Sequence, residues 1–327
     1  MTTLEAVDVR VQFATRGGAV ATALDSANLI VRPGEVVALV GESGSGKTTL
    51  ARSLLGLQQL AGGQVRLDGA PLDYSASGLR ALRRRVQMIL QDPAGALNPR
   101  HTVYESVAEG VRLHRLATGQ PGQTESELVA AALAAAGLRP PQKLFLRYPH
   151  ELSGGQRQRV LIAGSLALQP ELLIADEPVS SLDASIRGEV LALLLKLRDT
   201  MGLGVLVVTH DLGLAWNIAD RIAVMYLGRI IEAGATEEVL AHPRHPYTQA
   251  LLSVVPEIEE LTPIVLVGEI PDPTRIPAGC RFHPRCPALA DASAAAVAAR
   301  CQSEPLPVLS GDPDGHRVAC YLHPESA

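Results

Sequence analysis

Hydrophobic residues along the chain fall into short blocks of β-branched and aliphatic side chains, separated by glycine, proline and polar turns. Blocks of this kind predict buried strands, and the clearest cover residues 35–40, 86–90, 172–175 and 205–209. Segments with a helical pattern lie between them. Strands that alternate with helices indicate a parallel α/β core, in which ligands bind at the carboxyl ends of the strands.

Shorter patterns surround this core. Residues 4–13 and 27–31 have strand-like composition and predict an antiparallel β subdomain near the N-terminus. Residues 221–226 and 229–232 predict a hairpin that turns at Gly228.

A helical pattern interrupts the core between about residues 93 and 165. Thr124 and Glu127 have the spacing of a capping box that opens a helix over residues 128–136. Gly137 supplies a C-terminal stop for that helix. We therefore predict an inserted α-helical subdomain over about residues 93–165.

Composition narrows the class of protein. The 327 residues suffice for one large domain or two, and with 47% hydrophobic but only 3% aromatic residues the core must be mainly aliphatic. The formal net charge of −5 argues against a dedicated nucleic-acid binder. Neither an apolar run of about eighteen residues nor a signal-peptide pattern is visible, so we expect a cytosolic protein that reaches a membrane only through a partner.

The predicted strand at residues 35–40 runs directly into a loop of the form G-x-x-x-x-G-K-[ST]. Its glycines let backbone N–H groups turn toward phosphate oxygens. Lys47 adds a cation near the β- and γ-phosphates, and the Thr48 hydroxyl is suited to ligate Mg²⁺. The sequence therefore predicts an ATP site formed by Gly41, Ser43, Gly44, Ser45, Gly46, Lys47, Thr48 and Thr49.

Polar residues follow the other core strands. Asp176 and Glu177 form an acidic pair, which suits a metal ion and a polarised water. We predict that Asp176 holds Mg²⁺ through water and that Glu177 orients or activates the attacking water. Gln91 can reach the Mg²⁺ or that water, and His210 can contact the γ-phosphate.

Two more features belong to the predicted nucleotide site. Ser153, Gly154, Gly155 and Gln156 form a Ser/Gly loop that opens a helix, and a helix N-terminus suits an anion such as phosphate. Phe13 is the candidate for stacking on the adenine, because aromatic residues are scarce and this one ends a strand. An ordinary core role for Phe13 remains the alternative.

All four cysteines lie in the last fifth of the chain, at Cys280, Cys286, Cys301 and Cys320. A change to Pro-rich sequence near residue 256 predicts a nucleotide-binding domain over residues 1–255 and an extension over 256–327. A disulfide framework is not expected in a reducing cytosol, whereas four thiolates can hold zinc or an iron–sulfur cluster; free or paired thiols are the remaining alternative. Residues 288–300, between Cys286 and Cys301, are Ala-rich and look helical.

The order of these motifs resembles the nucleotide-binding subunit of an ATP-binding cassette (ABC) transporter. The resemblance covers about residues 4–255 and rests on GESGSGKTT (41–49), Gln91, LSGGQ (152–156), LLIADEP (172–178), SSLD (180–183) and His210. A narrower resemblance to the ATPase subunits of oligopeptide and dipeptide importers rests on QDPAGALNPR (91–100), RYPHELSGGQRQR (147–159), HPYTQALL (245–252) and GCRFHPRCP (279–287). Related importers for nickel or glutathione share much of this pattern, so the cargo stays open.

The resemblance implies a P-loop NTPase fold: an ABC ATPase core with an antiparallel β subdomain, an inserted α-helical subdomain and a cysteine-containing C-terminal extension. It implies an ATP-hydrolysing subunit that energises an importer. ATP would lie in a head-to-tail dimer, between residues 41–49 of one subunit and residues 153–156 of the other. The resemblance also implies that Asp183 contacts the nucleotide. Water would attack the γ-phosphate in line.

The resemblance also implies partners and a further cofactor. These are a second ATPase subunit, either a related chain or an identical one, two membrane permeases and an extracytoplasmic substrate-binding protein. Short permease helices would enter a groove near Gln91, which would hold the subunit at the cytoplasmic face of the membrane. Similar importer ATPases carry a cysteine-rich tail with a [4Fe–4S] cluster, for which zinc is the alternative. In that pattern the second and third cysteines lie closer together than here, so His283, His316 and His323 are possible substitutes for Cys301 as a ligand.

Two other functions compete with this one. A soluble ABC ATPase that acts on ribosomes or DNA would normally bring two cassettes, a coiled-coil insertion or a basic surface, and none is visible. A regulatory cassette that binds ATP without hydrolysing it is disfavoured by Glu177 and His210.

Overall fold

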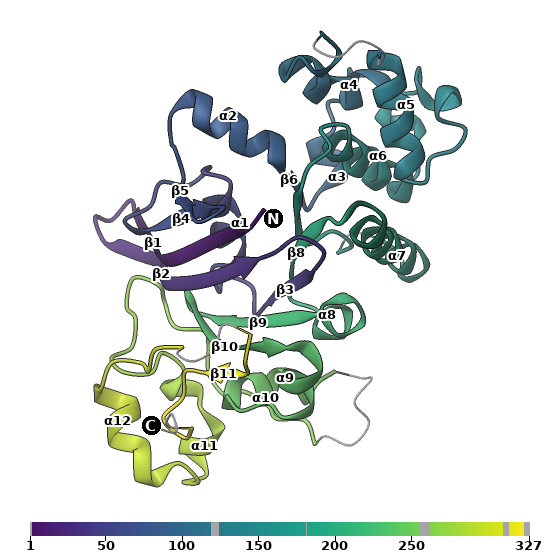
Figure 1. Cartoon of the computed structure of the whole chain (residues 1–327). Coiled ribbons are helices and arrows are strands. Elements are labelled where there is room, and N and C mark those ends of the chain that lie inside the picture. Colours follow the sequence, from purple (N-terminus) through teal and green to yellow (C-terminus); the bar gives the residue numbers. More distant parts are fainter. Residues whose placement is uncertain (1, 119–123, 181, 256–261, 310–313, 324–327) are drawn as a thin grey trace. The chain divides into compact units, whose positions relative to one another are not determined.

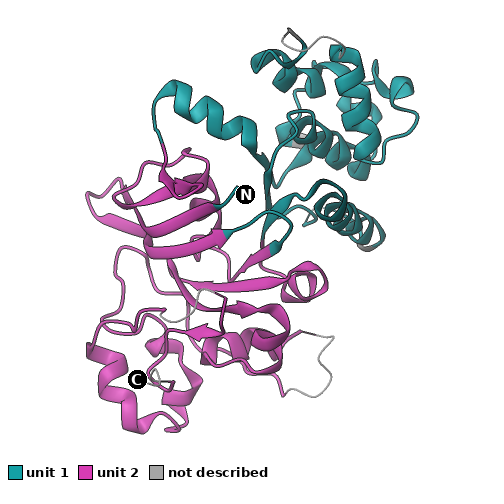
Figure 2. Cartoon of the chain, in the orientation of Figure 1, with its two compact units in different colours: residues 1–3, 31–36, 73–207 teal, residues 4–30, 37–72, 208–327 magenta. Residues whose placement is uncertain are grey.

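The chain divides into two compact units in a computed structural model that describes residues 2–118, 124–180, 182–255, 262–309 and 314–323. Unit 1 contains residues 1–3, 31–36 and 73–207, and unit 2 contains residues 4–30, 37–72 and 208–327 (Figure 2). Each unit is thus built from segments that are distant in the sequence. Residue 256 lies outside the described residues, and the division at 255/256 stays a prediction.

One sheet of unit 2 confirms the predicted antiparallel β subdomain. Its strands follow the order β2-β1-β4-β5, with bounds Val20–Val31, Leu4–Ala14, Gly62–Leu67 and Ala70–Pro71 (Figure 1). Buried and less buried residues alternate along β1 on either side of an irregularity at Asp8 (φ 49°): Leu4, Val9 and Val11 are buried, while Glu5 and Arg10 are not. This alternation is what a half-buried strand requires.

The second group of strands in unit 2 carries the phosphate loop. Strand β3 pairs in parallel with β9, β9 pairs with β10 as the predicted hairpin, and β10 pairs with β11; their bounds are Val36–Val40, Arg221–Tyr226, Arg229–Ala235 and Arg317–Val318. All five residues of β3 are buried, as the continuous apolar block predicts. The helices of this part are α1 (Lys47–Leu54), α8 (Leu212–Ile218), α9 (Thr236–Ala241) and α10 (Pro246–Leu252).

Unit 1 contains the other core strands, in the order β8-β7-β6. Strands β6 and β7 run parallel, as predicted. Helix α7 ends at Gly202, whose left-handed conformation (φ 64°) forms the C-cap. The bounds of these elements are Val86–Ile89 for β6, Leu172–Asp176 for β7, Gly204–Thr209 for β8, Ala76–Arg85 for α2 and Ala184–Met201 for α7.

Helices α4, α5 and α6 pack together in unit 1 and confirm the inserted helical subdomain (Figure 1). Thr124 caps α5 with the predicted capping box, and Thr102 caps α4 in the same way. Tyr104 donates a hydrogen bond to Glu125 at 2.9 Å and so joins α4 to α5. The helices of this part are α3 (Pro93–Ala96), α4 (Val103–Leu113), α5 (Glu125–Ala135) and α6 (Gly154–Leu166), with 3₁₀ turns at Leu116–Thr118, Pro141–Leu144 and Pro149–Glu151.

The predicted single helix over residues 288–300 is wrong. The backbone turns at Ala292, which has a left-handed conformation (φ 61°), and the Asp291 side chain accepts a hydrogen bond from the Ser293 N–H at 2.9 Å. This Asx turn competes with a helix and breaks it, despite the alanines. The extension contains instead 3₁₀ turns at His283–Arg285 and Ala295–Val297 and two short helices, α11 (Pro287–Ala290) and α12 (Ala298–Ser303).

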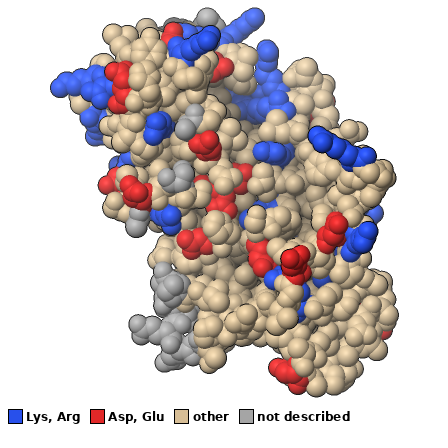
Figure 3. Space-filling model, turned by 180° about the vertical axis from the view of Figure 1, so that it is seen from behind, with Lys and Arg blue, Asp and Glu red and all other residues tan. Residues whose placement is uncertain are grey.

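No helix in the described ranges has both the length and the apolar character needed to cross a membrane. Acidic and basic side chains are interspersed on the face drawn in Figure 3, and much of that face is uncharged. A surface of mixed charge does not create a strong field of one sign for a polyanion.

Candidate nucleotide-binding site

The phosphate loop joins β3 to α1 within unit 2, in the strand–loop–helix context that the sequence predicts. Two of its glycines cannot be replaced without moving the backbone. A Cβ on Gly41 would lie 2.2 Å from the Met225 carbonyl oxygen, and a Cβ on Gly46 would lie 2.6 Å from that of Ala23. Gly46 is also the N-cap of α1 in a left-handed conformation (φ 108°). Close backbone approach therefore explains these glycines.

Lys47 lies inside the loop with its side chain almost completely shielded from solvent. Its ammonium group donates hydrogen bonds to the carbonyl oxygens of Gly41, at 2.7 Å, and Glu42, at 2.9 Å. Both are loop carbonyls rather than carboxylates, so the positive charge is not neutralised by them. A buried cation at the N-terminus of a helix is suited to phosphate oxygens.

Two further observations show that the loop fits a phosphorylated ligand. The Ser45 hydroxyl is buried and has no hydrogen-bond partner among the described residues. The N-cap of α1 makes no side-chain capping bond, and its first turn contains no acidic residue. The N-terminus of α1 is therefore left for a ligand rather than satisfied by the protein's own side chains.

The acidic pair lies at the end of β7 in unit 1. Asp176 is the last residue of the strand and is buried, and Glu177 follows it with a left-handed backbone (φ 49°). The Glu177 carbonyl accepts hydrogen bonds from the Ser180 N–H, at 3.3 Å, and the Ser180 hydroxyl, at 3.2 Å. A left-handed non-glycine residue costs of order 1 kcal/mol, and such strain clusters at functional sites.

The Ser153–Gln156 loop opens helix α6 in unit 1. Ser153 is the N-cap, its hydroxyl accepts from the Gln156 N–H at 3.2 Å, and the Gln156 side chain accepts from the Ser153 N–H at 3.0 Å. A Cβ on Gly155 would lie 2.7 Å from Cγ2 of Ile186, so this glycine packs closely against α7. The predicted helix N-terminus is confirmed.

The other predicted residues end strands or begin helices. Gln91 follows β6 and is exposed, and His210 follows β8 and is exposed. Asp183 is the exposed N-cap of α7. Phe13 lies on β1 with 41% of its surface exposed, which is too much for an ordinary core residue.

The predicted set is shared between the units. Unit 2 contains Phe13, the phosphate loop and His210. Unit 1 contains Gln91, Ser153–Gln156, Asp176, Glu177 and Asp183. Glu42 is not among the predicted site residues, although all its polar groups make contacts; its place as the second residue of the loop was the only signal in the sequence.

A groove of about 820 Å³ lies within unit 1. It is lined by helices α2, α4 and α6 and by the end of β6, where Leu90 immediately precedes Gln91. Leu90 and Leu113 are exposed apolar side chains in its wall, at 46% and 57%. The groove can therefore accept an apolar helix or loop.

The four cysteines are free thiols, and burial is the largest cause of the raised pKa of each thiol. The pKa of Cys280 rises to about 11 and that of Cys320 to about 12, with neighbouring cysteines as a further cause. No group of three or more His, Cys, Asp or Glu side chains in the described part of the chain is arranged to hold a metal ion. The geometry therefore does not support the predicted iron–sulfur or zinc site.

The fold and the phosphate loop define the class of this protein as an ABC-type ATPase. Residues 24–180 match the family model described as "ABC transporter", and residues 231–292 match "Oligopeptide/dipeptide transporter, C-terminal region". The chain belongs to the ABC transporter family, among the ATP-binding proteins of peptide importers.

Curated relatives match over nearly the whole chain. A putative peptide import ATP-binding protein of Brucella ovis is 43% identical over 91% of this chain and 90% of its own length. The oligopeptide transport ATP-binding protein AppF of Bacillus subtilis is 40% identical, with 98% of each chain covered. OppF of Escherichia coli is 40% identical over 97% of this chain and 95% of its own.

Solved structures agree on the cassette fold. CbiO1 from Clostridium perfringens, described as part of an ABC transporter complex, has a TM-score of 0.64 at 31% identity; the match covers 73% of this chain and 90% of that one. The ATP-binding cassette MJ0796, in a dimer bound to ADP and Pi, has a TM-score of 0.63 at 28% identity over 71% of this chain and 98% of that one.

Proposed function

We propose that this chain is the ATP-hydrolysing subunit that energises an ABC importer for peptides of the dipeptide or oligopeptide class. The phosphate loop carries the proposal, because buried Lys47, the tightly packed Gly41 and Gly46 and the uncapped α1 form a site suited to nucleotide phosphates. The match to the oligopeptide/dipeptide transporter C-terminal region, and peptide-import relatives that align over most of the chain, support the cargo class.

We assign the chemistry as follows. Lys47 and the N-terminus of α1 bind and neutralise the phosphates. Thr48, Gln91 and Asp176 would hold Mg²⁺, which supplies charge stabilisation at the transferring phosphoryl group. Glu177, held in its strained turn, orients and deprotonates the attacking water. His210 contacts the γ-phosphate. Catalysis then rests on positioning and charge neutralisation.

Phe13 stacks on the adenine in this proposal, and its exposed ring on β1 is consistent with that role. The loop Ser153–Gln156, with Asp183, closes over the nucleotide of a second ATPase subunit. That subunit is a related chain or a second copy of this one. The dimeric state of the cassette MJ0796 supports a dimer.

The groove of unit 1 receives short helices of two permease subunits. Its exposed apolar walls and its position beside Gln91 support this assignment. Such docking holds the subunit at the cytoplasmic face of the membrane, and an extracytoplasmic binding protein delivers the peptide. Nickel and glutathione are the alternative cargoes.

We further propose that the four cysteines bind one metal centre, with a [4Fe–4S] cluster first and zinc second, although the described side chains are not already arranged to hold a metal ion. In support, the Cys280 N–H donates to the Cys301 carbonyl at 2.8 Å, which brings these two cysteines together, and neighbouring cysteines contribute to the raised pKa of Cys280 and of Cys320. Anaerobic purification with metal analysis and an absorption spectrum tests this. A colourless zinc protein rules out the cluster, and a metal-free protein rules out both.

The decisive experiment for the main proposal uses the chain co-expressed with its permeases and reconstituted in vesicles. Glu177→Gln should keep ATP binding and reduce hydrolysis by about 100-fold or more, the usual contribution of a positioned general base. Glu237→Gln, at an exposed position on α9, is the matched control and should hydrolyse ATP normally. Normal turnover by Glu177→Gln refutes the role of Glu177. Failure of the wild-type chain to bind ATP refutes the function.

A further inference from the structure

Two segments of unit 2 lie outside the predicted catalytic set but reach the phosphate loop. One is residues 245–252, which contain α10. The other is residues 279–287, which contain two of the cysteines. Both meet Glu42, the second residue of the loop, through Tyr247 and Arg285.

All the polar groups of Glu42 are engaged. Its N–H donates to the Tyr247 hydroxyl at 2.9 Å. Its carbonyl accepts from Lys47, at 2.9 Å, and from the Ser45 N–H, at 3.2 Å. Its carboxylate accepts two hydrogen bonds from the Arg285 guanidinium, at 2.9 and 3.1 Å. Glu42 thus connects the C-terminal extension directly to the phosphate-binding lysine.

The contact between Arg285 and Glu42 is sheltered. The Arg285 side chain is 7% exposed and that of Glu42 is 27% exposed. The hydrogen bond to Glu42 is the largest cause of the raised pKa of Arg285. Parallel, charge-assisted bonds in a sheltered place hold geometry more firmly than an exposed ion pair does.

An aromatic cluster fixes the position of both segments. Phe282, Tyr226 and Tyr247 are fully buried and meet edge to face, with centroid distances of 4.7 to 5.3 Å. The Arg285 N–H donates to the Phe282 carbonyl at 2.9 Å, so the arginine is anchored to this cluster. Such packing fixes the guanidinium relative to Glu42.

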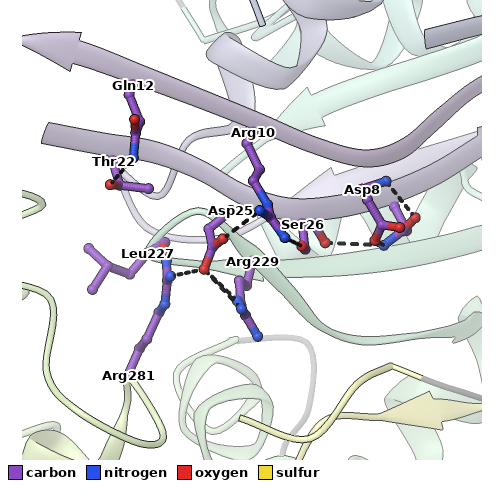
Figure 4. A network of polar contacts seen from close by, with 10 residues as sticks. Asp8, Arg10, Gln12, Thr22, Asp25, Ser26, Leu227, Arg229 and Arg281 are labelled. Carbon is purple, nitrogen blue, oxygen red and sulfur yellow. Dashed lines mark hydrogen bonds and ion pairs between the residues drawn. The ribbon is translucent and has the colours of Figure 1, made fainter. Parts of the chain in front are cut away.

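A second arginine of the extension supports the other side of the loop. Arg281 is buried, and burial lowers its pKa to about 10. Its guanidinium contacts Asp25 and the Leu227 carbonyl, and Asp25 also accepts from Arg229 at 3.0 Å (Figure 4). Gly228, which follows Leu227 in the chain, donates its N–H to the Ser45 carbonyl at 2.7 Å. The extension therefore reaches the phosphate loop by two routes.

We propose that Arg285 is a positioning residue for the nucleotide, which it controls through Glu42. This inference rests on the proposed function, because it assumes that the loop binds ATP. Lys47 must exchange its bond to the Glu42 carbonyl for phosphate oxygens when ATP binds. Arg285 and Tyr247 keep Glu42, and with it the loop backbone, in place during that exchange. The C-terminal extension thereby sets the nucleotide affinity of the cassette.

The test is calorimetric titration of the full-length chain with MgATP at low temperature. Arg285→Gln and Glu42→Gln should each weaken MgATP binding about tenfold. The double variant should bind MgATP no more weakly than the single variant with the lower affinity, as expected for one coupled contact. Arg285→Lys should restore part of the affinity. Arg300→Gln is the matched control, because Arg300 lies in the same extension in an exposed pair with Glu304 and should bind like wild type.

Thermal unfolding without nucleotide separates positioning from general stability. A merely structural role predicts a lower midpoint with unchanged MgATP affinity in every folded variant, and that result overturns the proposal. So do additive losses in the double variant. If Arg285→Gln does not fold, the MgATP affinities of Arg285→Lys and of the double variant, in which both charges are neutralised, decide between the two roles. A wild-type chain that does not bind MgATP contradicts the proposed function itself.

Discussion

The phosphate loop, residues 41–49, and the signature loop, residues 153–156, both place serine and glycine at the N-terminus of a helix. Their construction differs. The signature loop caps its own helix, because Ser153 and Gln156 satisfy each other's N–H groups. The phosphate loop has no side-chain cap and contains a buried lysine that donates to two loop carbonyls.

This difference assigns the loops to different tasks. An uncapped helix N-terminus beside a buried cation gains most from an anionic ligand, so the phosphate loop should bind nucleotide on its own. A capped helix is stable without a ligand, so the signature loop should act only when a second subunit presents its nucleotide. Four experiments test this contrast.

The largest effect is expected from Lys47→Ala. Removing the buried ammonium should weaken MgATP binding by the full chain and reduce hydrolysis by the complex by about 100- to 1,000-fold, as for loss of one charge-stabilising donor. Lys143→Ala, at an exposed position in the helical subdomain of unit 1, is the control. Tight MgATP binding by Lys47→Ala would show that the phosphate loop does not bind nucleotide by itself.

Acid should weaken the support of the phosphate loop. His245 accepts from the Tyr247 N–H, and burial lowers its pKa to about 4 from a usual 6.5; the Glu232 carboxylate opposes this shift and His323 adds to it. Between these values the unfolded chain binds a proton that the native chain does not, so stability falls as the pH falls from about 6.5 to 4. The loss over the whole window is roughly 3 kcal/mol.

His245→Asn provides the comparison for that titration, because its side-chain oxygen can still accept from the Tyr247 N–H. Denaturant unfolding between pH 7 and 4 should show a shallower pH dependence for His245→Asn than for wild type. Equal slopes would exclude His245 as the source.

A smaller effect should separate capping from function at the signature loop. Ser153→Ala and Thr124→Ala each remove the N-cap of a capping box in unit 1 and should each cost about 1 kcal/mol of stability. Only Ser153→Ala should also reduce hydrolysis by the assembled complex, and neither should change MgATP binding by the isolated chain. Equal ATP hydrolysis by the two variants in the complex would show that Ser153 serves only as a helix cap.

The smallest effect is expected from Phe13→Leu. Loss of adenine stacking should weaken ATP binding about fivefold, corresponding to roughly 1 kcal/mol. Binding of tripolyphosphate, which has no base, should stay unchanged. Tyr74→Leu, which changes another exposed aromatic residue, should affect neither ligand. Equal losses for ATP and tripolyphosphate would show that Phe13 supports the loop rather than the base.

Local interactions made much of this molecule predictable. The apolar blocks became buried strands because a continuous run such as residues 36–40 can hide its side chains only inside a sheet. The capping box at Thr124 and the left-handed Gly137 bounded a helix where predicted, since the partners of the capping box lie within a few residues. The helix after the phosphate loop begins at Lys47, because Gly46 is its N-cap.

The sequence by itself therefore determined the strand–loop–helix motif, the parallel core strands and the class of ATPase. Tertiary structure decided what surrounds the phosphate loop. Glu42 and Arg285 are 243 positions apart, and no periodicity or spacing could pair them. The pair forms because β3, β9 and α10 bring Tyr226 and Tyr247 together and Phe282 packs against both. Burial then leaves each of the two charges with the other as its partner, which only the folded chain can specify.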